Sequence, residues 1–278
     1  MSGAAAEKLK ASDLAGALDA LQADVRKHPA DPKLRVFLFQ LLCVMGDWKR
    51  AVTQLKVSAE MDEAALPMAQ TYREGIVCEV FREKVFAGEK APMIFGEPPE
   101  WVALIIEALK VQAEGRAEAA AALRARAFEA APAAGGALNG ERFAWIADAD
   151  MRLGPLLECV LNGKYYWIPF TAISTIAVEP PTDLRDTVWV PCTLTLQNGG
   201  EMVALIPTRY PATTTEGSDA AKLARETTFA DAGAETWVGL GQRLFATDTG
   251  DTGIMDLRTL EMDPVDQPGT GAADTADG

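Results

Sequence analysis

The sequence predicts an α+β protein, in which a helical repeat domain comes first and a compact, mostly antiparallel β-rich domain follows. Three observations predict this order. A 34-residue repeat is present near the N-terminus, a run rich in glycine, alanine and proline interrupts the chain near its middle, and turns of the Asn-Gly type separate short apolar segments after it.

The repeat is clearest where residues 12–18 match residues 46–52, at an offset of 34 residues. That offset is the period of a tetratricopeptide-like helix pair. In each copy the first residue ends one helix, the aspartate after it caps the next helix, and a small alanine allows close helix packing. A weaker copy of the pattern begins at Gly115. We therefore expect a TPR-like helical domain over residues 1–131.

The helix expected over residues 32–45 carries two apolar stripes instead of one. Pro32 suits its first turn, and one stripe has the spacing of a core face. The second stripe comprises Val36, Phe39 and Cys43. It is a candidate wall for a partner-binding groove, and contact with the next helix of the repeat is an equally good interpretation.

Further helices are expected around Tyr72–Phe81 and Trp101–Leu109, and an alanine-rich helix should end near Pro132. Residues 132–140 have the composition of a linker. Two copies of the repeat match well, so the array should be short and degenerate.

Antiparallel hairpins mark the second half. Asn162-Gly163 separates two short apolar segments, and Asn198-Gly199-Gly200 separates two more. Together with shorter strands near Thr175–Val178 and Trp237–Ala246, they predict a β-rich domain over residues 141–262.

Charge excludes several classes of partner. The net charge is −14, and residues 246–278 alone carry eight acids and one arginine. Such a chain repels phosphate groups, so we expect neither nucleic-acid nor membrane binding. Residues 263–278 have little to bury and should form a disordered acidic tail. With no signal-peptide pattern and no long apolar run, a cytoplasmic location is expected.

Catalytic and metal-binding patterns are weak. The four cysteines stand singly, which indicates buried thiols instead of a zinc site or a disulfide framework. His28 is the one histidine and ends a helix, so no Ser/His/Asp arrangement can form. We expect no cofactor and no bound metal.

Two acidic or glycine-rich motifs could still carry chemistry. Asp148 and Asp150 have the spacing of a D-x-D metal site, but no parallel β-α unit precedes them. Gly239 and Gly241 match part of a dinucleotide fingerprint, yet the sequence continues as a strand where that fingerprint opens a helix. We favour structural roles for both motifs.

An arginine between two acids, in Asp183-Leu-Arg185-Asp186, resembles part of an active site. A guanidinium flanked by carboxylates cannot act as a base, and it keeps the acids ionised. We interpret the motif as a buried clamp that ties a loop to the sheet. The residues assigned to this clamp are Asp183, Arg185, Asp186, Trp189, Arg209 and Arg243.

Five segments resemble the ImpE family, whose members are also called SciE or TagJ and are accessory proteins of bacterial type VI secretion. The segments that carry the resemblance are residues 148–158, 162–170, 181–189, 209–211 and 239–243. They occur in the family's order. The sequence differs from the family's pattern at two positions. Ala212 stands where the family usually has glycine, and Phe229 stands where it usually has tryptophan.

The resemblance implies a cytoplasmic, non-enzymatic adaptor. The implied partner is the small sheath subunit, through its N-terminal helix, with modulation of sheath assembly or of disassembly by the ClpV unfoldase. Aromatic side chains of the β-rich domain, Tyr165 and Tyr210, offer a second candidate docking surface. Two alternatives stay open: a metal-dependent enzyme that uses Asp148, Asp150, Asp183 and Asp186, and a generic peptide-binding chaperone.

Overall fold

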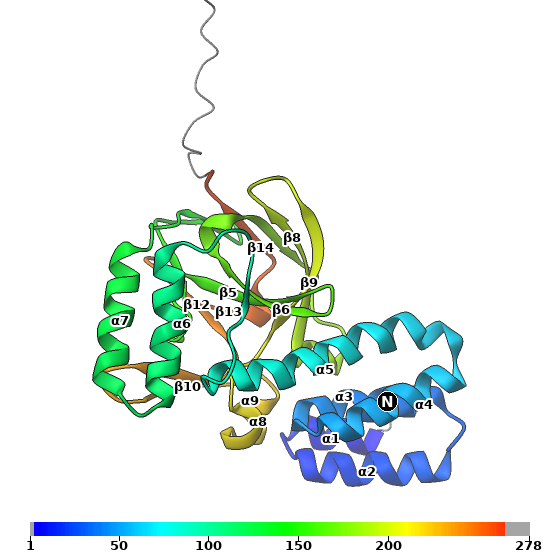
Figure 1. Ribbon diagram of the computed structural model, residues 1–278. Coiled ribbons are helices and arrows are strands. Elements are labelled where there is room, and N and C mark those ends of the chain that lie inside the picture. The colour runs from blue at the N-terminus through cyan, green and yellow to red at the C-terminus, as the bar shows by residue number, and fades with distance from the viewer. Residues whose placement is uncertain (1–2, 265–278) are drawn as a thin grey trace, which may run out of the picture.

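The computed structural model describes residues 3–264 and confirms the α+β class, with helices first and a β-rich part after them. Figure 1 shows α1–α4 on one side of the molecule, α6 and α7 on the other, and the long α5 running between them beneath the sheet. Apart from Asp263 and Pro264, the predicted acidic tail lies outside the described residues.

The helices begin and end close to the predicted positions. Their bounds are α1 Gly3–Lys10, α2 Leu14–Lys27, α3 Pro32–Met45, α4 Trp48–Met61, α5 Leu66–Phe86, α6 Glu100–Ala113 and α7 Ala117–Ala130. A short 3-10 turn, η1 (Glu63–Ala65), joins α4 to α5. Within residues 3–264 no helix combines the length and apolarity that crossing a bilayer requires.

What recurs in the 34-residue repeat is the turn between two helices, which we call a helix corner. Ser12, Gly46 and Gly115 all adopt positive φ, at 55°, 76° and 79°, and each donates its amide to the carbonyl three residues before it. The following amide bonds the carbonyl five residues back, which is the Schellman end of a helix. In the first two copies Asp13 and Asp47 then cap the next helix through their side chains.

The alanines predicted to permit close packing are buried in all three copies. Their identities are Ala17, Ala51 and Ala120, each with no exposed surface. The corner, the cap and the small residue therefore recur together, and the TPR-like interpretation of the first half is confirmed.

The described residues form three sheets, and every strand but the first comes from the second half. The strands are β1 Met93–Ile94, β2 Gly136–Leu138, β3 Glu141–Phe143, β4 Ile146–Asp148, β5 Leu156–Leu161, β6 Lys164–Pro169, β7 Ile173–Val178, β8 Trp189–Leu196, β9 Glu201–Pro207, β10 Thr227–Asp231, β11 Trp237–Gly241, β12 Leu244–Thr247, β13 Gly250–Gly253 and β14 Thr259–Met262. The largest sheet has the order β1-β6-β5-β9-β8-β7-β14-β2-β3, beside a β13-β12-β4 sheet and a β10-β11 hairpin.

Both predicted hairpins are present. Asn162 and Gly163, with φ of 48° and 71°, connect β5 to β6, and β8 pairs with β9 from Trp189–Pro207 to Thr195–Glu201. Among the described strands, every pair is antiparallel except β1 with β6.

The predicted linker at residues 132–140 needs correction. Gly136–Leu138 forms β2, which pairs with β3 on one side and with β14 on the other. In addition, β1 comes from the helical half and joins the edge of the large sheet beside β6. β2 thus has strand partners on both edges and β1 on one, and local composition does not reveal this long-range pairing.

Side chains of β5 alternate between two hydrophobic cores. Leu157, Cys159 and Leu161 point into a core between the large sheet and the β13-β12-β4 sheet. Leu156 and Val160 point the other way, into a core shared with the helices. All four cysteines are buried and free, as predicted.

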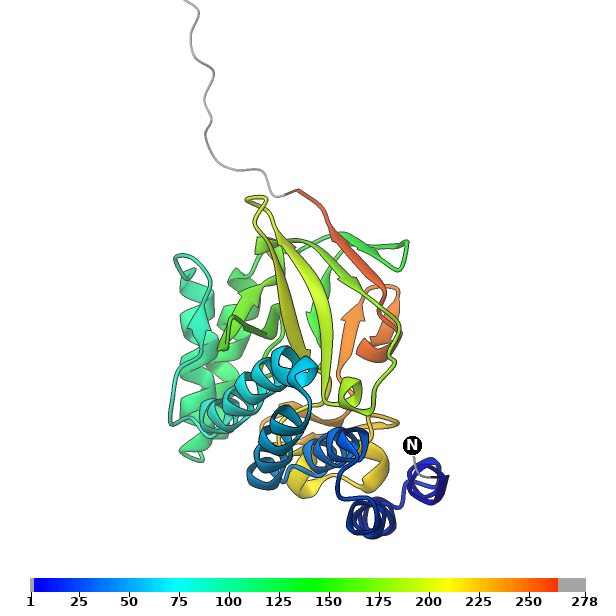
Figure 2. The same ribbon diagram turned by 90° about the vertical axis from the view of Figure 1, so that its right-hand side faces the viewer.

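A segment after β9 contacts the first two helix corners. It contains α8 (Thr213–Glu216) and α9 (Asp219–Lys222), which lie against α1–α4 in both ribbon views (Figures 1 and 2). Arg209 donates to the carbonyls of Cys43 and Val44 at the end of α3, at 3.3 and 2.7 Å.

The same contact recurs one repeat earlier. Arg225 donates to the carbonyls of Leu9 and Lys10 at the end of α1, at 2.7 and 3.2 Å. Leu9 and Lys10 precede Cys43 and Val44 by 34 positions, so two arginines from the β-rich half cap equivalent helix ends. A cation at these carbonyls also suits the helix dipole.

The contact between Gly46 and Thr214 predicts a difference between two glycine substitutions. A Cβ at Gly46 would lie 2.6 Å from the Thr214 Cβ, whereas nothing lies within 4 Å of a Cβ at Gly115. We expect Gly115→Ala to lower the free energy of unfolding by about 1 kcal/mol, because of its positive φ. Gly46→Ala should cost about 1–3 kcal/mol more, because of the clash.

Urea denaturation of both variants measures the difference. Equal costs would mean that the segment carrying Thr214 does not pack on the α3–α4 corner.

Candidate functional site

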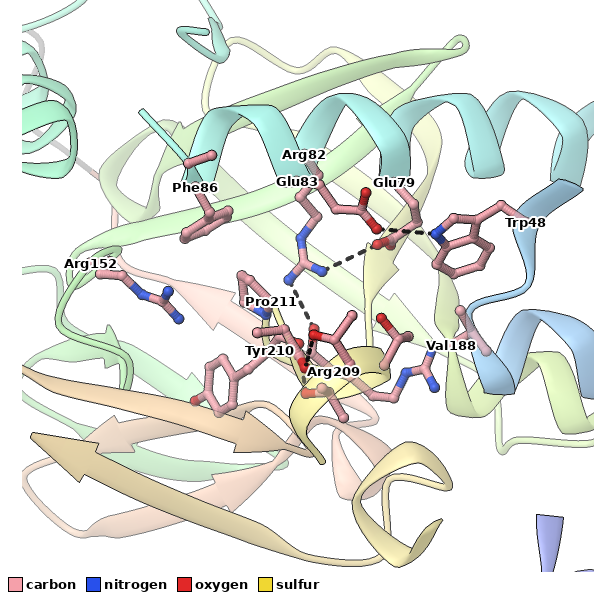
Figure 3. Close-up of a pocket in the computed structure, with 15 residues that line it drawn as sticks. Trp48, Glu79, Arg82, Glu83, Phe86, Arg152, Val188, Arg209, Tyr210 and Pro211 are labelled. Atoms are coloured by element: carbon pink, nitrogen blue, oxygen red, sulfur yellow. Dashed lines mark hydrogen bonds and ion pairs between the residues drawn. The ribbon is translucent and has the colours of Figure 1, made fainter. Parts of the chain in front are cut away.

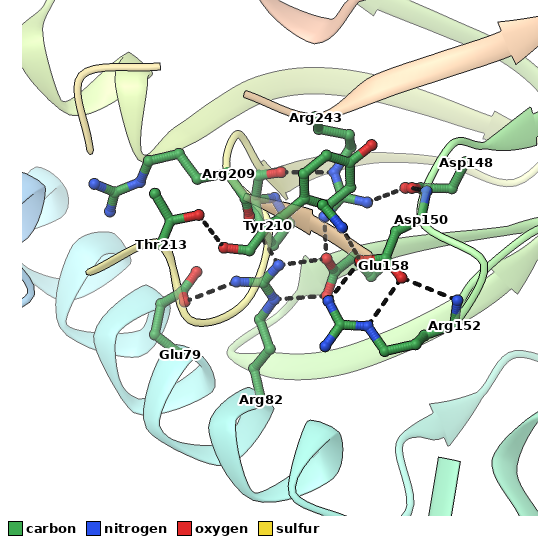
Figure 4. A network of polar contacts seen from close by, with 12 residues as sticks. Glu79, Arg82, Asp148, Asp150, Arg152, Glu158, Arg209, Tyr210, Thr213 and Arg243 are labelled. Atoms are coloured by element: carbon green, nitrogen blue, oxygen red, sulfur yellow. Dashed lines mark hydrogen bonds and ion pairs between the residues drawn. The ribbon is translucent and has the colours of Figure 1, made fainter. Parts of the chain in front are cut away.

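A network of buried charged side chains lies between α5 and the sheet (Figure 4). Its centre is Glu158 on β5, which lies on the helix-facing side of that strand. Arg82 of α5 forms a bidentate pair with it, with Nε–Oε2 and Nη2–Oε1 distances of 2.7 and 2.6 Å. Arg243, directly before β12, pairs with Glu158 and with Asp148 of β4.

Neighbouring polar groups complete the network. Glu79 accepts hydrogen bonds from Arg82 at 3.3 Å and from the Trp189 indole at 3.0 Å. The Tyr165 hydroxyl donates to Glu158 and accepts from the Trp167 indole. Arg243 and Glu158 are fully buried, so nearly every charge in the network is balanced by a direct contact instead of by water.

The number of arginines around each acid determines its pKa. Burial alone would raise the pKa of Glu158, but the charges of Arg82 and Arg243 outweigh it and lower that pKa to about 2. Burial raises the pKa of Asp148 to about 7, because Arg243 offsets burial only in part and the nearby Asp150 adds to the rise. Glu158 is therefore the firmly ionised member.

The predicted clamp at residues 183–186 is only partly as expected. Arg185 pairs with Asp183 at 2.5 Å and lies over the Tyr72 ring, while Asp183 also accepts from Gln40 of α3. Asp186 accepts from the amides of Thr182 and Asp183 and so caps the 3-10 turn η3 (Leu184–Thr187). The motif does tie its loop to the helices, although Asp183 and Arg185 remain partly exposed.

Other predicted members of that clamp lie elsewhere. Trp189 bonds Glu79, Arg209 caps α3, and Arg243 joins the Glu158 network. None of the three bonds a side chain of residues 183–186, so the predicted set is divided among three places. Spacing along the chain could not reveal this, because each contact spans at least 85 residues.

The four acids of the enzyme hypothesis do not form one site. Asp148 is held by Arg243, and Asp150, also buried, accepts from Arg152 and from the Gly239 amide at 3.0 Å. Asp183 and Asp186 belong to the separate η3 corner. In residues 3–264 no group of three or more His, Cys, Asp or Glu side chains is placed to hold a metal ion.

Most of the predicted partner-binding residues are inaccessible, which corrects that prediction. Phe39 and Cys43 are fully buried, Tyr165 belongs to the Glu158 network, and Tyr210 is 1 % exposed. The Tyr210 ring packs so closely on β11 that a Cβ at Gly239 would lie 2.3 Å from it. Val36 alone of the five is partly exposed. Tyr165 and Tyr210 were expected at the surface, but their hydroxyl groups have hydrogen-bond partners inside the fold.

A cleft of about 290 Å³ borders the network (Figure 3). One wall is the α5 stripe from Glu79 to Phe86, and the facing wall is the segment 209–215. At its rim the Trp48 indole donates to Glu83 at 3.1 Å. Of its charged groups, Arg82 pairs with Glu79, Arg152 pairs with Asp150 and Arg209 donates to backbone carbonyls, so the cleft lies where two parts of the fold are joined.

Sequence reasoning missed Glu79, Arg82 and the central role of Glu158. Two signals were present. Glu158 interrupts an otherwise apolar strand, and Glu79 and Arg82 share the buried face of α5 with Ile76. A charge at a core position requires a partner, but the sequence does not say which one.

Also informative is Ala212, which departs from the usual family glycine. Its φ is 65°, a left-handed conformation that glycine adopts without strain. The backbone conformation at position 212 therefore favours glycine, the residue expected there from the family resemblance.

Removing the charge of Glu158 should destabilise the protein strongly. Glu158→Gln preserves shape but leaves Arg82 and Arg243 without a full counter-charge, so we expect a loss of about 3–5 kcal/mol in the free energy of unfolding. The matched control is Glu114→Gln, which removes an exposed partner of Arg116 and should cost less than about 1 kcal/mol. Similar costs in urea denaturation would refute the network's role.

The lowered pKa of Glu158 also predicts a pH dependence. The ordinary value of 4.5 applies in the unfolded chain, so ionised Glu158 stabilises the fold above about pH 4.5, and this contribution is lost as pH falls toward about 2. The stability difference between the native protein and Glu158→Gln should therefore shrink on acidification from about pH 6 to about pH 3. A constant difference would contradict the assignment.

Comparisons with known proteins agree with this geometry. The model of the family described as ImpE protein matches residues 140–261. The type VI secretion system accessory component TagJ of Pseudomonas aeruginosa is 53% identical over 262 residues, covering 94% of this chain and 92% of that protein. The crystal structure of protein VPA1032 from Vibrio parahaemolyticus matches with a TM-score of 0.84 and 27% identity, over 93% of this chain and 97% of that one.

The family match covers the β-rich half, and the two relatives extend the likeness across the helices. On this evidence the chain belongs to the ImpE family.

Proposed function

We propose that this protein is a non-enzymatic accessory component of bacterial type VI secretion that acts in the cytoplasm by binding another protein. The observation that carries the proposal is the 53% identity, over 94% of the chain, to a Pseudomonas aeruginosa protein named as such a component. Because the match extends through both halves, the whole architecture is common to the two proteins.

The site geometry supports binding over catalysis. The acids that could have acted as general bases or metal ligands, Asp148, Asp150 and Glu158, are each engaged by an arginine. A base so paired cannot take a proton from a substrate without breaking a buried contact. The network instead fixes how the helical repeats lie on the sheet.

We further propose that the partner is the small sheath subunit, recognised through its N-terminal helix, and that binding modulates sheath assembly or its disassembly by the ClpV unfoldase. Helix pairs of repeat proteins present surfaces onto which an amphipathic helix can lay apolar anchors.

Co-purification tests the proposal. The tagged chain is expected to retain the small sheath subunit, and deletion of that subunit's N-terminal helix should abolish retention. Retention that survives the deletion, or no retention at all, would refute the assignment of this partner.

A competition experiment separates a dedicated adaptor from a generic chaperone. Unrelated amphipathic helical peptides should fail to displace the subunit at concentrations at which its own N-terminal helix does so. Displacement by all of them alike would favour the chaperone instead.

A further inference from the structure

The cleft between α5 and the segment 209–215 is lined by three arginines and two acids. Arg82, Arg152 and Arg209 come from α5, from the loop between β4 and β5, and from the segment after β9 (Figure 3). Positive charge therefore exceeds negative charge along the walls of the cleft, although the whole chain has a net charge of −14.

Both acids of the cleft already have hydrogen-bond donors. Glu79 accepts from Arg82 at one oxygen and from the Trp189 indole at the other. Glu83 lies at the exposed rim, where it accepts from the Trp48 indole. Within residues 3–264, no ion pair joins Arg209 to either of these acids.

Arg209 is thus a buried arginine without a carboxylate in contact. It is 4 % exposed, and its two terminal nitrogens donate to backbone carbonyls. Burial lowers the pKa of Arg209 to about 10, because the charge of the nearby Glu79 offsets the loss of water only in part. An anion in the cleft would supply the missing counter-charge.

Unused hydrogen-bond donors border the same space. Among the described residues, Nη1 of Arg152, Nε of Arg209 and Oγ1 of Thr214 have no hydrogen-bond partner. None of the three atoms is sealed from solvent, and all three residues line the cleft. Because donors are in excess, a ligand that brings acceptor oxygens fits the cleft best.

We propose that this cleft binds a small organic anion, held through a carboxylate or phosphate group. The oxygens of that group would accept from Arg152, Arg209 and Thr214. Guanidinium groups suit either head group, because neighbouring N–H groups can bond two oxygens at once. The proposal goes beyond the proposed function, and its test needs no partner protein.

The remaining walls indicate what else the ligand carries. They are apolar and partly aromatic, with contributions from Trp48, Phe86, Val188 and Pro211. The volume of about 290 Å³ is at the lower end of the range for small-molecule sites. We therefore expect a compact ligand with a short apolar or aromatic body, and neither a nucleotide nor an extended peptide.

A ligand in the cleft would contact both halves of the fold. One wall belongs to the helices α4 and α5, and the facing wall belongs to the segment after β9. Because the two walls face each other only in the folded protein, the ligand would bind the folded state and not the unfolded chain. Binding should therefore raise the temperature of unfolding.

Thermal unfolding of the full-length chain, in chloride buffers of fixed ionic strength, tests this expectation. The probes are inorganic phosphate, phenyl phosphate and benzoate, with benzyl alcohol and benzylamine as neutral and cationic counterparts. At least one anion should raise Tm by about 3 °C at about ten times its Kd, and neither counterpart should do so. No rise with any anion, or an equal rise with benzyl alcohol, would overturn the proposal.

Two substitutions test whether the anion lies in the cleft. Thr215→Glu adds a carboxylate to the lining at an exposed position, so it should weaken binding about tenfold or more. Thr214→Val keeps the shape of the side chain but removes one donor, so it should weaken binding about fivefold or more. The matched control, Thr249→Glu, adds the same charge to the turn between β12 and β13 and should bind within about twofold of the native protein.

Calorimetric titration of these variants with the tightest-binding anion gives the decision. Native affinity in both cleft variants would place the anion elsewhere and refute the cleft assignment. An equal loss in Thr249→Glu and Thr215→Glu would also refute it, because the overall charge of the chain would then control binding. Thr214→Val keeps the test decisive if Thr215→Glu folds poorly. Preference for phenyl phosphate over benzoate would identify the head group as phosphate, and the reverse preference would identify a carboxylate.

Discussion

The pairing of Glu158 with Arg82 and Arg243 is the interaction on which the remaining structure depends. Because Glu158 lies at the middle of a strand buried on both faces, it can stay ionised only with both guanidinium groups in place. Arg82 is 76 residues away on a helix, and Arg243 is 85 residues away beside a second sheet. One carboxylate thus determines where three elements meet.

Arginine side chains that cap helix ends also connect the β-rich half to the helical repeats. Arg209 donates to a carbonyl at the end of α3, and Arg225 donates to the equivalent carbonyl at the end of α1. Because these two helix ends are 34 residues apart in the repeat, the β-rich half makes the same contact with two successive repeats. Helical repeats alone contact only their neighbours and can open one unit at a time. Here the segment between β9 and β10 holds two units in a fixed relation, which explains how a short, degenerate array can remain ordered.

Local sequence patterns correctly predicted those features that depend on residues close together in the chain. The corners at Ser12 and Gly46 and the Asn162-Gly163 hairpin follow from backbone conformations that few residues adopt, so they were predicted correctly. The network was not, because composition cannot reveal which buried charges meet across the fold. Tyr165 and Tyr210 were placed on the surface because the pattern of apolar residues does not show which helices and strands cover them, although the hydroxyl partner of Tyr165, Glu158, is only seven residues away.

The central claim is that helices and sheet form one cooperative unit joined by buried charge, and equilibrium unfolding followed by two probes tests it most directly. Far-UV circular dichroism at the helical minimum reports the repeats. Fluorescence of the buried Trp167 and Trp189 reports the sheet in a variant whose other four tryptophans are replaced by phenylalanine. The account predicts coincident transitions in urea. A helical transition that is complete before the fluorescence changes would contradict it.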